Sequence, residues 1–162
     1  MRLSKDIKNK ILQKTQKEID FDALKAEIAS TSMETSIYVG CDSLPKGKYI
    51  DWIVVLVIHF DSNKGGTYKF GKYRETKRAR TMGMKERLWK EVEMVAEVAL
   101  ALEPYIGERK FEVHLDLNPN KKDKSSVIIT EAVGYITALG FDAVVKPDSF
   151  AASSVADMRV RK

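Results

Sequence analysis

The order of strand-like and helix-like segments along this chain leaves few folds open. Residues 49–60 (YIDWIVVLVIHF) form the most apolar segment and have the length of a buried strand, and the turn sequence DSNKGG follows directly. Strand-like segments lie on both sides of this one, and helices alternate with strands from residue 81 onward. The predicted strands are residues 36–42, 49–60, 67–75, 111–117 and 141–146, and the predicted helices are residues 81–102, 126–139 and 149–161.

Three successive strands followed by helix-linked strands predict an α/β fold with one mixed five-stranded sheet flanked by helices. The first, fourth and fifth strands are expected to run parallel. The length of 162 residues suits a single domain. We therefore assign residues 35–162 to the α/β domain. Residues 1–34 carry apolar stripes of one broken or two short helices, and are predicted to be an N-terminal helical extension.

Acidic residues stand at the ends of the three strands that are expected to be parallel. Asp42 ends the first strand, Asp116 lies near the end of the fourth, and Asp148 follows the fifth. The carboxyl ends of parallel strands meet at one edge of an α/β sheet, where active sites form. The three carboxylates are therefore expected to gather at that edge.

Glu91 is a fourth candidate, because it interrupts the apolar face of the long predicted helix. A carboxylate on the face toward a sheet is costly unless something compensates it. A cation shared with the strand-end aspartates is the compensation we favour, and a buried Lys or Arg partner is the alternative. The stripe, with spacings of three and four residues, is Met84, Leu88, Glu91, Val95, Val98 and Leu102.

The basic residues are concentrated in one part of the chain. Residues 64–87 contain nine basic and two acidic residues, while the net charge of the whole chain is only +5. Aromatic residues interleave with these charges, a combination that suits a polyanion such as nucleic acid. A solvated edge strand kept soluble by its lysines is the alternative. The candidate substrate-binding residues are Lys72, Arg74, Lys77, Arg78 and, beyond this stretch, Lys146.

The candidate ligands determine which metal the site would take. Carboxylate oxygens favour Mg²⁺ or Mn²⁺. Cys41 is the only cysteine, which excludes an intramolecular disulfide and a multi-cysteine zinc site. Two ions about 4 Å apart would activate water and stabilise the leaving oxygen in phosphodiester hydrolysis. Asp42 is the residue expected to bridge them.

Three sequence phrases carry a family resemblance: YVGCDS, HLDLNPN and, above all, KPDSFAASSVAD near the carboxyl end. They resemble the YkuK-type family of uncharacterised bacterial proteins, which is assigned to the ribonuclease H-like superfamily. The resemblance implies a ribonuclease H-like fold and a metal-dependent nuclease site. The acidic positions of nucleases in this superfamily correspond to Asp42, Glu91, Asp116 and Asp148 in this chain.

Asp157 competes with Asp148 for the last ligand position, because it belongs to the same motif. Nine residues of helix span roughly 13 Å, so both residues do not readily bind one metal if a helix begins at Ser149. If Ser149 to Ser153 is a loop instead, Asp157 becomes the better ligand. Asp148 is ranked slightly ahead.

These observations predict a divalent-metal-dependent nuclease acting on RNA, RNA–DNA hybrid or structured DNA. The alternative is a non-catalytic nucleic-acid-binding module with the same fold. No signal peptide or membrane-spanning segment is legible in the sequence, and a cytoplasmic location is expected. His114 has the strand parity of Asp116, although a lone strand histidine is more often structural. The oligomeric state stays open.

Overall fold

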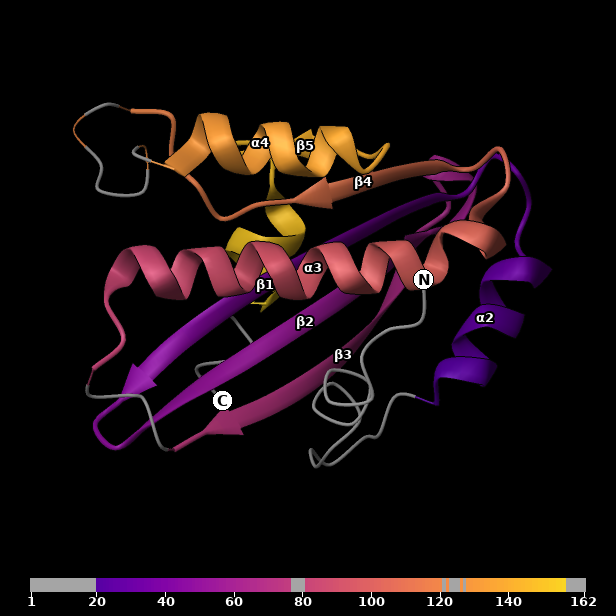
Figure 1. Ribbon diagram of the computed structural model, residues 1–162. Coiled ribbons are helices and arrows are strands. Elements are labelled where there is room, and N and C mark those ends of the chain that lie inside the picture. The colour runs from indigo at the N-terminus through magenta and orange to yellow at the C-terminus, as the bar shows by residue number, and fades with distance from the viewer. Residues whose placement is uncertain (1–19, 77–80, 121, 123–125, 127, 157–162) are drawn as a thin grey trace.

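A computed structural model describes residues 20–76, 81–120, 122, 126 and 128–156 of the chain (Figure 1). Its centre is a five-stranded sheet with the order β3-β2-β1-β4-β5. The first strand is central, β2 is antiparallel to both β1 and β3, and β4 is parallel to both β1 and β5. The predicted mixed sheet is therefore confirmed. The strands are β1 (Ser36–Lys46), β2 (Tyr49–His59), β3 (Gly66–Glu75), β4 (Lys110–His114) and β5 (Asp142–Val144).

Helices cover both faces of the sheet. The long helix α3 crosses the sheet in Figure 1 and packs against β1, β2 and β4, and α4 packs against α3 and β5. On the opposite face, the short π-helix η3 packs against β1 and β2. The helical elements are α2 (Phe21–Ser30), η1 (Phe60–Ser62), α3 (Met84–Ile106), α4 (Ile129–Ala138) and η3 (Ala151–Ala156).

The alternation of side chains in β2 explains why residues 52–58 of this strand are all apolar. Trp52, Val54 and their neighbours of the same parity enter the main core beneath α3. Ile53 and Val55 point to the other face and form a second, smaller core with Ala156 of η3. Because both faces are covered, β2 carries apolar residues at successive positions rather than at alternate ones.

An N-capping side chain fixes the start of helix α2. Asp20 is its N-cap, and one carboxylate oxygen accepts hydrogen bonds of 3.0 Å from the backbone N–H groups of Asp22 and Ala23. Leu24 and Ile28 of α2 belong to the main core. The second half of the predicted extension thus packs into the domain, whereas the expected helical stripe in residues 3–11 lies outside the described residues.

The first strand is longer than expected, and the fourth is shorter. β1 continues to Lys46, which pairs with Tyr49, because the turn needs only Gly47 and Lys48, with Gly47 at φ 60°. The prediction that Asp42 ends this strand was wrong. β4 ends at His114, opposite Gly40 of β1, so Asp42 lies just beyond the last β1–β4 pair.

The fifth strand is also shorter than predicted. β5 covers residues 142–144, although the N–H of Lys146 still donates to the carbonyl of Leu117, at 3.0 Å. Asp148 therefore follows a turn and not the strand itself. The predicted last helix, residues 149–161, is described only as η3 up to Ala156. Among the described helices, none combines the length and apolar character needed to cross a membrane.

Candidate functional site

Asp42 lies at the notch where β4 separates from β1. The last residue pair of the two parallel strands is Gly40 with His114. Asp42 is two residues beyond Gly40 on β1, and Asp116 is two residues beyond His114, past the end of β4. The side chain of Asp42 is nearly buried, with 8 % of its surface exposed. Both of these predicted site residues thus follow the last β1–β4 pair, toward the carboxyl ends of the parallel strands.

Glu91, on α3, is linked to Asp42 by hydrogen bonds to one serine, Ser43. The residues of its stripe are buried from Leu88 to Leu102, and Glu91 itself is 6 % exposed. Ser43 connects the two carboxylates: its hydroxyl donates to Oε1 of Glu91, and its backbone N–H donates to Oδ1 of Asp42 at 2.8 Å. Nη1 of Arg87 in turn donates to the hydroxyl and the carbonyl of Ser43, at 3.2 Å each.

The surroundings of Glu91 disfavour its negative charge. Burial raises the pKa of Glu91 well above its usual value, and the charge of Asp42 raises it further. The hydrogen bond from Ser43 and the charge of Arg87 lower this pKa, while Asp116 adds to the increase. The charges of Asp42 and Asp116 therefore both disfavour the ionised form of Glu91.

Asp116 has a cationic partner within the protein. Nζ of Lys146 lies 2.7 Å from Oδ1 of Asp116, and the Lys146 side chain is 39 % exposed. Lys146 is one of the predicted substrate-binding residues, and in this structure it partly neutralises the carboxylate cluster. An exposed lysine beside a carboxylate is still able to reach an anion from solvent.

Asp148 is exposed in the turn before η3, and its charge acts on the ring of His114. Asp157 lies outside the described residues, which end at Ala156 in this part of the chain. The structure therefore places Asp42 and Asp116 within electrostatic range of Glu91, while Asp148 stands in the turn that leads to η3.

His114 has a structural role. Its ring is 1 % exposed, Nδ1 accepts a hydrogen bond of 3.2 Å from the backbone N–H of Ala151, and Nε2 lies 3.1 Å from Oε2 of Glu112. An accepting Nδ1 leaves the proton on Nε2, facing Glu112. Burial lowers the pKa of His114, although Glu112 acts in the opposite direction. The neutral ring thus joins β4 to the start of η3.

Sequence reasoning missed Gly40, which sets the position of η3. A Cβ atom at Gly40 would lie 2.5 Å from the backbone nitrogen of Ala152 and 2.8 Å from the carbonyl carbon of Ala151. Only glycine permits this close approach of helix backbone to strand backbone. The small residues Ala151, Ala152 and Ala156 are fully buried here, which accounts for much of the KPDSFAASSVAD motif. The available signal was a glycine inside a strand-like segment.

The predicted substrate-binding residues Lys72 and Arg74 lie on β3, and both contact Asp51 of β2. Lys77 and Arg78 lie outside the described residues. Asp51 and its further partner Lys46 were also missed by sequence reasoning. The sequence gives little indication of this contact, because Lys46 lies between two predicted strands. Only the register of β1 and β2 shows that it reaches Asp51.

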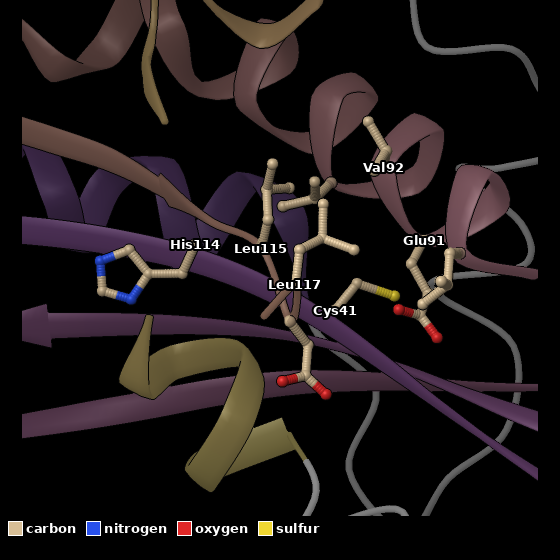
Figure 2. A pocket seen from close by; sticks show the side chains of 9 residues that line it. Cys41, Glu91, Val92, His114, Leu115 and Leu117 are labelled. Atoms are coloured by element: carbon tan, nitrogen blue, oxygen red, sulfur yellow. The ribbon is translucent and has the colours of Figure 1, made fainter. Parts of the chain in front are cut away.

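Figure 2 shows the side chains around a narrow cavity under α3, with Cys41 turned toward Glu91 and the ring of His114 pointing away from both. Burial raises the pKa of the Cys41 thiol well above its usual value, and Glu91 and Asp42 raise it further, so the thiol stays protonated. The cavity has no room for a water molecule. A hydrated cation would therefore sit at the open edge of the sheet.

The carboxylate oxygens of Asp42, Glu91 and Asp116 are suitable ligands for a divalent cation, but the side chains are too far apart to share one. Carboxylate oxygens are hard donors, and a cation would stabilise the ionised form of the buried Glu91. In the part of the chain that the structure describes, however, no three His, Cys, Asp or Glu side chains are close enough together to hold a metal ion. Occupancy would require the carboxylates to draw closer, a ligand from outside the described residues, or both.

Comparison with known proteins identifies relatives. The chain is 44 % identical over 57 residues to the uncharacterized protein YkuK of Bacillus subtilis (strain 168), a match that covers 33 % of this chain and 32 % of that protein. The N-terminal RNase H domain of Rv2228c from Mycobacterium tuberculosis, solved as a fusion with maltose-binding protein, gives a TM-score of 0.37 at 11 % identity, covering 78 % of this chain and 94 % of that one.

The family model described as ribonuclease H-like matches residues 20–161, which is most of the chain. This match starts at the N-cap of α2 and includes every described strand. Together with the YkuK match it confirms the resemblance seen in the sequence motifs. The chain therefore belongs to the ribonuclease H-like family.

Proposed function

We propose that this protein is a divalent-metal-dependent nuclease that hydrolyses phosphodiester bonds in RNA, RNA–DNA hybrid or structured DNA. The observation that carries the proposal is Glu91, a carboxylate buried in an apolar helix face beside Asp42 and within the field of Asp116. Burying like charges together costs free energy that a bound cation would offset. The ribonuclease H-like family supports a nuclease or nucleic-acid-binding role for the fold.

Asp42, Glu91 and Asp116 are the proposed ligands for Mg²⁺ or Mn²⁺, and they would serve as the catalytic carboxylates. One or two such ions would supply an activated water and stabilise the leaving oxygen. Ser43 and Arg87 position the carboxylates, because Ser43 hydrogen-bonds to both Asp42 and Glu91 and is itself held by Arg87.

The fourth ligand is proposed to be Asp148 or Asp157, and the packing of η3 now favours Asp157. Ala156, the residue before Asp157 in sequence, packs with Ile53, which is the cross-strand partner of Asp42. Asp148 is exposed in the turn before η3. Asp157→Asn is therefore expected to weaken metal binding more than Asp148→Asn.

The remaining basic residues are proposed to hold the nucleic-acid backbone. Lys146 stands beside Asp116 with its side chain partly exposed, and Lys72 and Arg74 lie on the same sheet face as Asp42. Lys77 and Arg78 follow β3 in sequence and extend its positive charge. Each phosphate that these residues neutralise would release condensed counterions and favour binding.

A cleavage assay tests the proposal. Labelled single-stranded, duplex, hybrid and junction oligonucleotides are incubated with the protein in Mn²⁺ or in EDTA, and the products are separated by gel. We expect product from at least one substrate in Mn²⁺ alone. Asp42→Asn should abolish it, whereas the matched change Glu93→Gln, at an exposed position on α3, should leave it unchanged. Equal product from wild type and Asp42→Asn would contradict the proposal.

A non-catalytic nucleic-acid-binding module is the second candidate. The lack of a group of three metal-donor side chains among the described residues favours it, as does the ion pair that occupies Asp116. Such a module would bind oligonucleotides equally well in Mn²⁺ and in EDTA and would yield no product in either. The cleavage assay and a binding assay on the same samples distinguish the two.

A further inference from the structure

Asp51 is a buried carboxylate with three cationic partners. It lies in β2 and is fully buried, with 0 % of its surface exposed. Arg74 binds it with two parallel hydrogen bonds, from Nε to Oδ1 at 2.7 Å and from Nη2 to Oδ2 at 3.0 Å. Nζ of Lys46 and Nζ of Lys72 lie 3.2 and 3.4 Å from Oδ2. The cluster therefore joins three adjacent strands.

The partners supply more positive charge than Asp51 needs. One bidentate arginine neutralises a carboxylate, but three cations meet this one, so these four side chains alone sum to +2. Burial alone would raise the pKa of Asp51, yet the bonds from Arg74 and Lys46 and the charge of Lys72 leave it below its usual value. Asp51 is thus a stable anchor that gathers excess positive charge.

The cations are held in place and still reach solvent. The guanidinium of Arg74 stacks over the ring of Tyr49 at 3.7 Å, so its plane is fixed by both the ring and the carboxylate. The side chains of Arg74, Lys46 and Lys72 are 47, 30 and 18 % exposed. Cations that are already ordered lose little conformational entropy when they bind an anion.

The cluster stands beside the proposed carboxylate site. Asp42 pairs with Ile53, and Ile53 pairs with Lys72, so these three residues form one row across the sheet. Neighbouring strands lie about 4.8 Å apart, which puts the backbones of Asp42 and Lys72 roughly 10 Å from each other. Asp51 and Arg74 pair in the adjacent part of the same face.

We propose that Asp51 is a positioning residue that holds Lys46, Lys72 and Arg74 as one binding site for the phosphates of a nucleic-acid strand. Lys46 is the new contact, since it comes from β1 and not from the basic stretch. The strand would lie along the exposed side chains of Lys46, Lys72 and Arg74, beside the part of the sheet face that η3 covers. The role of the site relative to catalysis rests on the proposed nuclease function, but its phosphate binding does not require a metal.

The test is binding of a fluorescently labelled oligothymidylate strand, measured by anisotropy in EDTA over a range of salt concentrations. Lys46→Gln, Lys72→Gln and Arg74→Gln should each weaken binding and reduce the slope of log K against log salt by about 0.7, the value for one single-strand phosphate contact. Lys64→Gln is the matched control. It removes one charge from the same hairpin, where Lys64 pairs with Asp61 at 2.9 Å, and should leave the slope unchanged.

Arg74→Lys separates ordered geometry from charge alone. It keeps the charge but loses the two parallel bonds to Asp51 and the planar stack on Tyr49, so binding should weaken with the fold intact by circular dichroism. If Arg74→Lys bound the oligothymidylate strand as tightly as wild type does, the positioning role of Asp51 would be contradicted. Unchanged slopes for Lys46→Gln and Lys72→Gln would overturn the site itself.

Inorganic phosphate is added as a competitor at the same phosphate concentration as the oligonucleotide. The proposal predicts no displacement, because a strand engages several cations at once. Full displacement would show a site for free phosphate instead and overturn the strand assignment. All of these measurements are made in EDTA, so a failure of the nuclease proposal appears only as absent cleavage while strand binding persists.

Discussion

At the scale of single residues, the environment of Glu91 separates a ligand from a structural ion pair. Its hydrogen-bond donor is Ser43, a neutral hydroxyl, and Arg87 reaches the same serine rather than the carboxylate itself. Burial and the charges of Asp42 and Asp116 all raise the pKa of Glu91. These surroundings favour the neutral carboxyl, and a cation bound beside Glu91 would favour the ionised form instead.

Glu91→Gln tests this assignment through stability. The amide keeps the shape and still accepts from Ser43 while removing the charge, so in EDTA the variant should be as stable as wild type, to within about 0.5 kcal/mol, or more stable. Thermal melts in EDTA and in Mn²⁺ measure it, with Glu93→Gln as the exposed control on the same helix. A loss of about 3 to 5 kcal/mol in EDTA would instead indicate a broken buried ion pair.

At the scale of elements, η3 is held to the sheet by close backbone packing and one histidine. Gly40 lets the backbone of Ala151 and Ala152 lie directly on β1, and His114 accepts the N–H of Ala151. This packing determines where the chain leaves η3 after Ala156, and hence whether Asp157 can serve the carboxylate site.

Gly40→Ala should therefore destabilise the protein and weaken metal binding together. The added methyl would meet the backbone at 2.5 Å, and we expect a loss of about 1 to 3 kcal/mol from overpacking. Gly134→Ala is the control, because a Cβ there meets nothing within 4 Å on an exposed face of α4. That change should instead stabilise the helix by about 0.5 to 1 kcal/mol. Chemical denaturation of both variants measures the difference, and equal stabilities would contradict the role of Gly40.

The elements also show what the sequence could and could not predict. Strand order and parallel pairing followed from the segment order, and Glu91 stood out because a helix has a fixed 3.6-residue period. The lengths of β1 and β4 did not follow, since they depend on pairing between strands far apart in sequence. The cation cluster escaped notice for the same reason: Asp51 meets Lys46 and Arg74 only through the registers of three strands.

At the scale of the whole molecule, Asp42 and the Asp51 cluster lie on the same sheet face, opposite to α3. Asp42 and Asp116 stand at the edge where β4 separates from β1, and the Asp51 cluster occupies the neighbouring strands. A cation at the first site and a phosphate backbone at the second would place a phosphodiester next to the carboxylates. A nuclease would need both sites, whereas a binding module would need only the basic site.

Titration of the metal-free protein with Mn²⁺, followed by calorimetry, tests the central claim most directly. Wild type should bind saturably, and Asp42→Asn and Asp116→Asn should each weaken binding strongly, since each removes a charged ligand. At a hundred times the dissociation constant, binding should also stabilise wild type by about 2.7 kcal/mol. The carboxylate site would be contradicted if wild type did not bind Mn²⁺. It would also be contradicted if wild type and both variants bound Mn²⁺ with equal affinity.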